Sequence, residues 1–162
     1  MVEPLAVAWH AVEQSAAKAG DNILVMGAGP IGLAILQCLK TCKPAQLIVA
    51  EVAPNRRNLA RQFGATAVID PQDEDVISKC KLLCNGQGPE IAFDCAGVAA
   101  SIKSACLSVR SRGTVVNVAT WDKEIPFDMN DLLFGEKRLL SGKSLARNAS
   151  ECVYAVLTYS KR

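Results

Sequence analysis

Two features of the sequence have the residue types and spacing for chemistry with a nucleotide: a glycine-rich hexad and an acidic residue that follows it. The hexad separates the apolar run 23–26 from an apolar-periodic stretch and reads Gly27-Ala28-Gly29-Pro30-Ile31-Gly32. In such a G-x-G-x-x-G turn the first glycine permits a tight reversal, the second lets the backbone approach a pyrophosphate, and the third lets the next helix pack close to the strand. The N–H groups and positive dipole end of that helix would face an anion in the turn.

The acidic residue is Glu51, which ends the next apolar run, 46–50, and follows Gly27 by 24 residues. At this spacing a carboxylate reaches the adenosine ribose of a dinucleotide and accepts hydrogen bonds from its hydroxyls. A carboxylate there repels a 2′-phosphate, so the sequence predicts NAD rather than NADP. Arg56 and Arg57 weaken that preference, because a guanidinium is the group that a phosphate would bind.

A single G-x-G-x-x-G is a weak signal, because glycine-rich turns also serve purely structural purposes. Here the strand before it, the helix that opens inside it and the acidic residue after the next strand occur together, which favours cofactor binding. The alternative ligand is S-adenosylmethionine, whose fold shares a glycine-rich turn and an acidic residue after the second strand. That alternative explains Pro30-Ile31-Gly32 and a sixth strand less well.

Short apolar runs alternate with helical patterns along the whole chain. We expect strands at residues 23–26, 46–50, 67–69, 91–93, 114–118 and 138–142. We expect helices at residues 5–19, 30–41, 56–63, 73–83, 98–109 and 148–160. Gly20 is expected to end the first helix and Asn55 to cap the third. Because parallel strands need crossovers and the crossovers here are helical, the pattern predicts an α/β fold with a doubly wound six-stranded parallel sheet, the Rossmann fold.

Length and composition support one domain over residues 1–162, since 162 residues of which 50% are hydrophobic can bury one core. The net charge of +2 comes from scattered lysines and arginines, which predicts no nucleic-acid or membrane-surface partner. No apolar stretch approaches the length of a membrane span. The N-terminal residues lack the pattern of a secretory signal, so we expect a cytoplasmic protein.

The seven cysteines are expected to be reduced and buried, because most lie on apolar faces of predicted elements. They are Cys38, Cys42, Cys80, Cys84, Cys95, Cys106 and Cys152. Two pairs have i,i+4 spacing, but neither has the further ligands that a zinc site needs. We therefore predict no zinc at those pairs. Glu3 and His10, taken alone, also read as an exposed carboxylate and a packed helical histidine.

Several stretches together resemble one known family, the zinc-dependent medium-chain dehydrogenases/reductases, and most of all the cofactor domain of its polyol and butanediol dehydrogenase branch. The resemblance covers essentially the whole chain. It is carried by Val2-Glu3-Pro4-Leu5-Ala6-Val7, His10-Ala11, the glycine hexad with Leu33, Phe63-Gly64-Ala65, Asp94-Cys95-Ala96-Gly97 and Arg112-Gly113-Thr114.

This resemblance implies roles for individual residues around the cofactor. Glu51 would hold the adenosine ribose, and Arg56 would lie along the adenine. Four residues after the later strands would line the path of the cofactor across the sheet, namely Cys95, Ala96, Val118 and Leu145. Glu3 would belong to the catalytic zinc environment, as a ligand or through one water. Zinc there polarises the substrate oxygen, but it needs three protein ligands, and one carboxylate does not complete the site.

In the family, a β-rich catalytic domain precedes the cofactor domain. The resemblance therefore implies that residues 1–20 form a helix arriving from that domain, and that this chain is the NAD-binding domain of a dehydrogenase acting on a secondary alcohol or diol, inactive by itself. It also implies a homo-oligomer through the sheet edge formed by residues 124–129 and 138–142. The alternative is a stand-alone nucleotide-binding or sensing module without redox activity.

Overall fold

Continuous apolar runs form the strands of one sheet, because helices cover both of its faces. The computed structural model describes residues 2–142. In chain order its elements are α1 (Val2–Ser15), β1 (Asn22–Met26), α2 (Pro30–Lys40), β2 (Gln46–Ala50), α3 (Pro54–Gln62), β3 (Ala67–Ile69), α4 (Val76–Leu83), β4 (Ile91–Asp94), α5 (Ala99–Ser108), β5 (Thr114–Asn117), α6 (Asn130–Leu133) and β6 (Arg138–Ser141).

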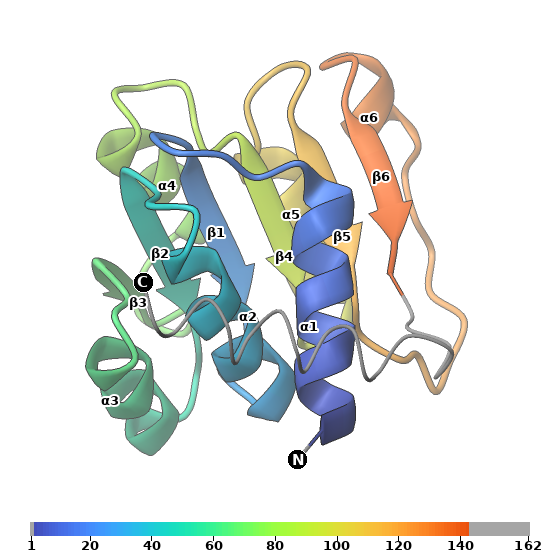
Figure 1. Cartoon of the computed structure of the whole chain (residues 1–162). Helices are drawn as coiled ribbons and strands as arrows, with labels where there is room; N and C mark the ends of the chain where they lie inside the picture. Colours follow the sequence, from blue (N-terminus) through green and yellow to red (C-terminus); the bar gives the residue numbers. More distant parts are fainter. Residues whose placement is uncertain (1, 143–162) are drawn as a thin grey trace.

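The strand order in the sheet is β3-β2-β1-β4-β5-β6, and every neighbouring pair is parallel. The chain builds outward from β1 to β3, returns to the other side of β1 with β4, and then builds outward again to β6 (Figure 1). Ala50 and Asp94 lie opposite Met26 in the two central pairings. This arrangement confirms the predicted doubly wound six-stranded parallel sheet, and it places the reversal of strand order between β1 and β4, where such sheets bind ligands.

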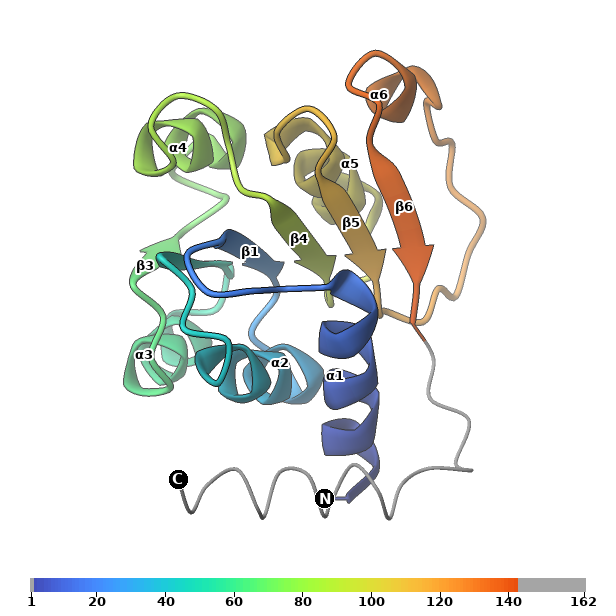
Figure 2. The ribbon, with the colours of Figure 1, turned by 45° about the horizontal axis from the view of Figure 1, so that its top comes forward.

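Alternate residues of each central strand serve the two faces of the sheet. Ile23 and Val25 of β1 pack with α1 and α2, whereas Leu24 and Met26 pack with α4 and α5. Figure 2 shows α1, α2 and α3 on one side of the sheet and α4 and α5 on the other. Phe93, in the middle of β4, is fully buried on the first face. The sheet is therefore a rigid base for the loops at its carboxyl edge.

The structure corrects three predicted helix boundaries. The first helix ends at Ser15 and not near Gly20, because Ala16 takes a left-handed conformation with φ 56°. The N-cap of α3 is Ala53 rather than Asn55, with Pro54 in the first turn, where its missing N–H costs nothing. The helix expected from residue 73 begins at Val76, because the Asp75 side chain accepts hydrogen bonds from the N–H groups of Ile77 and Ser78 and so caps it.

One described helix was not expected from the sequence. The short α6 follows residues 124–129, a segment that was expected to form part of the sheet edge, and the structure describes no strand over those residues. Four residues are too few for an apolar periodicity to show. The predicted closing helix at residues 148–160 lies outside the described residues.

The described helices also bear on membrane crossing. The longest of them, α1, has 14 residues, whereas an apolar helix needs about 20 to cross a bilayer. None of the helices that the structure describes combines the length and the apolar character that a crossing requires.

The left-handed conformation of Ala16 leads to a prediction about stability. Replacing Ala16 by Gly relieves a conformation that costs a residue with a Cβ roughly 1–2 kcal/mol, while the added freedom of glycine in the unfolded chain offsets part of this gain. The matched control is Ala17→Gly, at a neighbour without positive φ. In urea unfolding, Ala16→Gly should be about 1 kcal/mol more stable than Ala17→Gly. Equal stabilities would contradict the assigned turn.

Candidate functional site

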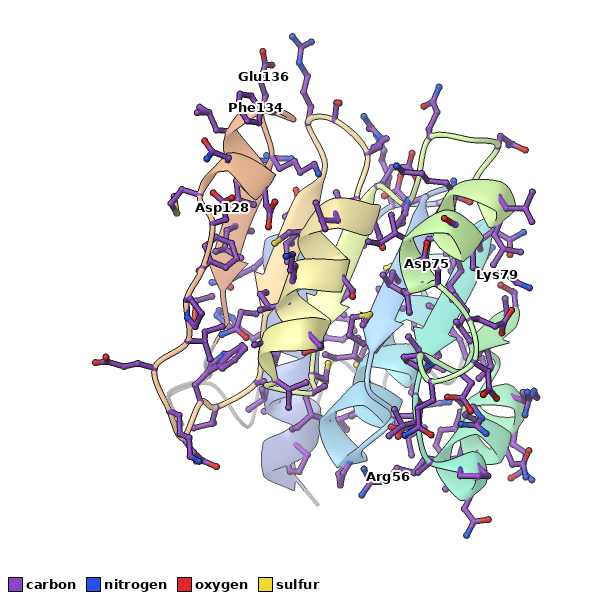
Figure 3. All side chains as sticks on the ribbon, turned by 180° about the vertical axis from the view of Figure 1, so that it is seen from behind. Arg56, Asp75, Lys79, Asp128, Phe134 and Glu136 are labelled. Atoms are coloured by element: carbon purple, nitrogen blue, oxygen red, sulfur yellow. The ribbon has the colours of Figure 1, made fainter. Side chains whose placement is uncertain are left out.

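A cleft of about 520 Å³ opens at the carboxyl ends of the central strands. Figure 3 views the molecule from the side of α4 and α5 and shows Arg56 at the lower edge, with Phe134 and Glu136 at the opposite edge. The cleft is lined by Met26, Gly27, Gly29, Ala50, Glu51, Val52, Arg56, Pro71, Glu74, Asp75, Val76, Cys95, Ala96, Val98, Ala100, Ser101 and Ser104. It therefore lies at the point where the strand order reverses.

The glycine turn after β1 depends on two of its glycines for its shape. Gly27 has φ 93°, a conformation that side chains disfavour, and its N–H donates to the carbonyl of Ala50 at 2.8 Å. A Cβ on Gly32 would overlap the carbonyl oxygen of Gly27. The first turn of α2 can thus follow the strand end closely only because Gly32 has no side chain.

Gly29 lies at the entrance of α2 and faces open space. It is the N-cap of this helix, and a Cβ built on it would meet no protein atom within 4 Å. Within the described part of the chain, the N–H groups of Gly29, Ile31 and Gly32 make no hydrogen bond. Unsatisfied N–H groups at a helix start, together with the dipole, favour an anion at this position.

Glu51 lies buried beside this turn, with 6% of its surface exposed. Its Oε2 accepts a hydrogen bond from the N–H of Ala28 at 2.7 Å, and its Oε1 accepts one from the N–H of Ala53 at 2.9 Å. The carboxylate thereby joins the turn after β1 to the turn after β2. A carboxylate has about four lone-pair sites, so it retains acceptor capacity for ligand hydroxyls.

The two arginines at the start of α3 differ in their surroundings. Arg57 lies in an ion pair with Asp70, at 2.6 Å between Nη1 and Oδ2. The same nitrogen donates to the carbonyl groups of Glu51 and Val52. Arg56 lines the cleft and is exposed. The sequence offers both arginines as partners of a 2′-phosphate, and the family resemblance places Arg56 along the adenine; of the two, Arg56 is the one that lines the cleft.

The end of β4 forms the other side of the cleft and holds a buried carboxylate. Asp94 has no exposed surface, and its Oδ1 accepts hydrogen bonds from Ser101 Oγ at 2.7 Å and from the N–H of Ala96 at 3.2 Å. Its Oδ2 has no hydrogen-bond partner in the described part of the chain. Burial raises the pKa of this carboxyl, against the opposing effect of its hydrogen bonds. Asp94 thus fixes the turn containing Cys95 and Ala96.

The other predicted site residues fall into two groups. Pro30 and Ile31 form the first turn of α2, and Val118 follows β5, with its N–H bonded to the carbonyl of Asp94 at 2.9 Å. None of these three is among the residues that line the cleft. Leu145 and the side chain of Glu3 lie outside the described part of the structure.

Most cysteines of the described residues are buried thiols. Burial raises the pKa of Cys80 to about 12 and that of Cys84 and Cys106 to about 11, so these thiols stay protonated at neutral pH. Cys38, Cys80, Cys84 and Cys106 are buried, as expected, whereas Cys42 and Cys95 are partly exposed. Cys152 lies outside the described residues. No group of three or more His, Cys, Asp or Glu residues that could hold a metal occurs in the described ranges.

Several residues that line the cleft were missed at the level of sequence. Pro71, Glu74 and Asp75 follow β3, and Ser101 begins α5. The signal that could have found them is positional, because the carboxyl ends of all parallel strands meet at one edge of the sheet. The residues just after β3 and β4 therefore belong beside the glycine turn.

Comparison with known proteins identifies the family. A family model described as zinc-binding dehydrogenase matches residues 30–158, which is most of the chain. The chain belongs to the zinc-binding dehydrogenase family. Among its relatives in this family, (R,R)-butanediol dehydrogenase from Neisseria gonorrhoeae is 35% identical over 137 residues, which cover 84% of this chain and 38% of that protein. Sorbitol dehydrogenase from Bacillus subtilis is 32% identical over 130 residues, which cover 80% of this chain and 37% of that protein.

Solved structures of zinc-binding dehydrogenases have the same fold. The crystal structure of 2R,3R-butanediol dehydrogenase from Bacillus subtilis aligns with a TM-score of 0.88 at 31% identity, covering 98% of this chain and 45% of that one. A protein described as a zinc-binding dehydrogenase from Sinorhizobium meliloti, bound to NADP, aligns with a TM-score of 0.87 at 29% identity, covering 97% and 47%. The predicted resemblance to this family is confirmed, and the chain spans less than half the length of these relatives.

The burial of Asp94 leads to a prediction about how the stability of the fold depends on pH. Because its pKa is raised in the folded state, the charged carboxyl destabilises the fold at neutral pH, and this cost disappears as the pH falls towards the unfolded-state pKa of about 3.9. Asp94→Asn should remove this pH-dependent contribution to the free energy of unfolding. The contribution amounts to about 1.4 kcal/mol for each unit by which folding raises the pKa. The gain in stability of the variant over the unaltered chain in urea unfolding should therefore grow as the pH rises above the unfolded-state pKa of about 3.9, and level off above the folded-state pKa. The exposed Asp122→Asn should show no such growth, and parallel profiles for Asp94→Asn would contradict the prediction.

Proposed function

We propose that this chain is the NAD-binding domain of a zinc-dependent alcohol or polyol dehydrogenase, and that it has no dehydrogenase activity by itself. The observation that carries the proposal is the position of Glu51, whose buried carboxylate is bonded to the glycine turn at the point where the strand order reverses. Membership of the zinc-binding dehydrogenase family supports a dinucleotide over S-adenosylmethionine as the ligand. We regard residues 1–162 as a single domain of a longer protein.

The bound dinucleotide would use groups that line the cleft and the N–H groups at the adjoining start of α2. The unbonded N–H groups of Gly29, Ile31 and Gly32 would receive the pyrophosphate. Glu51 would accept hydrogen bonds from the adenosine ribose hydroxyls, and Arg56 would lie along the adenine. The nicotinamide half would extend over the ends of the later strands, past Cys95, Ala96, Val118 and Leu145. Gly27 and Pro30 would shape the turn that brings these groups together.

In the parent protein, the proposed reaction moves a hydride from a secondary alcohol or diol to NAD. The names of the relatives, butanediol and sorbitol dehydrogenases, support a small alcohol or polyol as substrate. Zinc would act as a Lewis acid on the substrate oxygen, with Glu3 as a ligand or through one water. The described residues do not provide a zinc site, so its other ligands would come from the rest of the parent protein.

We propose a cytoplasmic protein, on chemical grounds. The buried thiols of Cys80, Cys84 and Cys106 are not joined in disulfides in the described part of the chain. Several cysteines that are not joined in disulfides are typical of a protein from a reducing compartment.

Titration of the purified chain with NADH and NADPH, followed by nicotinamide fluorescence, tests the cofactor. We expect NADH to bind at least about tenfold more tightly than NADPH, because the Glu51 carboxylate bonds ribose hydroxyls and repels a 2′-phosphate. Glu51→Gln should weaken NADH by about ten- to a hundredfold, the range of a lost charged hydrogen bond, and weaken NADPH less. The exposed Glu13→Gln is the control for net charge. Binding of neither cofactor, or a preference for NADPH, would overturn the assignment.

We further propose that two copies of this chain join through the edge of the sheet. The strand β6 ends the sheet and is mostly exposed, and Leu139 on it is 42% exposed. The neighbouring α6 region exposes Leu133 and Phe134 at 66% and 84%. An exposed strand edge with apolar side chains is a ready surface for pairing.

Sedimentation equilibrium at micromolar concentration tests this pairing. We expect a dimer for the unaltered chain and a monomer for Leu139→Lys, because a lysine on an edge strand opposes pairing. Leu82→Lys, at a residue 75% exposed on α4, is the matched control and should remain a dimer. A monomeric unaltered chain would count against the proposal.

A further inference from the structure

An ion pair lies behind the end of β2, next to the proposed ribose site. Arg57 and Asp70 lie 2.6 Å apart, and their side chains are only 17% and 15% exposed. Arg57 Nη1 also donates to the carbonyls of Glu51 at 3.1 Å and Val52 at 2.6 Å. Both of those residues line the cleft. The guanidinium therefore lies directly behind the segment that would meet the ribose.

The charged groups on the two sides of the segment 51–52 differ in whether an ion pair neutralises them. The Glu51 carboxylate faces the turn and binds two backbone N–H groups, and within the described part of the chain no lysine or arginine forms an ion pair with it. The Arg57 charge is neutralised by Asp70 at contact distance. Because both groups of that pair are largely withdrawn from water, their charges are screened less than those of surface residues.

We propose that Asp70 is a specificity-determining residue, which maintains a preference for NAD over NADP by keeping Arg57 neutralised and bound behind β2. This inference rests on the proposed function. Without the carboxylate, Arg57 would carry an uncompensated charge beside the ribose site, bonded only to two neutral carbonyls. A 2′-phosphate makes stronger charge-assisted hydrogen bonds than a carbonyl does, so it would compete for the guanidinium.

Two features of Asp70 make a precise substitution available. Its Oδ1 accepts a hydrogen bond from the N–H of Gln72 at 3.0 Å, while its Oδ2 binds Arg57. Asp70→Asn can keep the first bond and the shape of the side chain, and it replaces only the charged oxygen that holds the arginine. The structure also offers a matched control in Glu74, which lines the same cleft and pairs with Lys79. Glu74→Gln removes one negative charge from the cleft without releasing an arginine.

The experiment measures the ratio of NADH to NADPH affinity in the full chain by nicotinamide fluorescence. We expect Asp70→Asn to shift this ratio towards NADPH by about tenfold, from the gain of a charge-assisted contact, and Glu74→Gln to shift it by less than about threefold. Adding Arg57→Gln to Asp70→Asn should restore the original ratio. Partial unfolding of a variant lowers both affinities by the same factor, so the ratio still tests the proposal. If Asp70→Asn does not fold, Asp70→Ser retains a hydroxyl acceptor for Gln72 and takes its place.

The outcomes separate this inference from the function on which it rests. If the unaltered chain binds NADH, and Asp70→Asn and Glu74→Gln shift the ratio equally, the special role of Asp70 is overturned and the proposed function stands. A shift in Asp70→Asn that persists after Arg57→Gln is added also overturns it, because the arginine would then not be responsible. Failure of the unaltered chain to bind NADH overturns the proposed function, and the role of Asp70 with it.

Discussion

The geometry of the site depends on the carboxylate of Glu51 and its two backbone partners. By accepting hydrogen bonds from Ala28 and Ala53, it connects the turns that follow two neighbouring strands. A buried carboxylate is costly unless it is hydrogen-bonded, so the two turns and the side chain stabilise one another. The Glu51 carboxylate, a hydrogen-bond acceptor, is thus held beside the start of α2, where unbonded N–H groups favour an anion. A hydroxyl-binding group and a phosphate-binding group from two adjacent turns are thus brought together, which suits a nucleotide.

The carboxyl edge of the sheet is fixed by largely buried charged groups, whereas the amino edge combines ion pairs such as Arg110–Glu90 with exposed apolar side chains. At the carboxyl edge, Asp94 is buried and the pair of Arg57 and Asp70 is mostly withdrawn from water, each with hydrogen bonds that fix a loop. At the amino edge, α6 exposes the apolar side chains of Leu133 and Phe134. Buried charge is retained where loops must be fixed around a ligand, and exposed apolar surface occurs where a second protein surface can cover it.

The strands were predictable because their signal is local. Four- and five-residue apolar runs indicate strands covered on both faces, and the observed β1, β2 and β3 differ from the expected ranges by at most one residue. Helix starts were less predictable, since several residues compete for the cap. Asn55 was expected to cap α3, but the helix starts two residues earlier, with Pro54 in its first turn and Ala53 as its N-cap. Ala16, which follows the last residue of α1, is an alanine, and nothing in the sequence indicates its left-handed conformation.

The sequence by itself determined the fold class, the glycine turn and the position of Glu51 at the end of a strand. These follow from the alternation of strands and helices along the chain, from one local turn and from the spacing between two successive strands. Only the tertiary structure decided which distant residues share the site. It distinguished Arg57, bound by Asp70, from Arg56, which lines the cleft. It also buried Asp94 and brought the start of α4 to the same cleft. The physical reason is the parallel sheet, whose crossovers bring together strand ends that lie far apart in the chain.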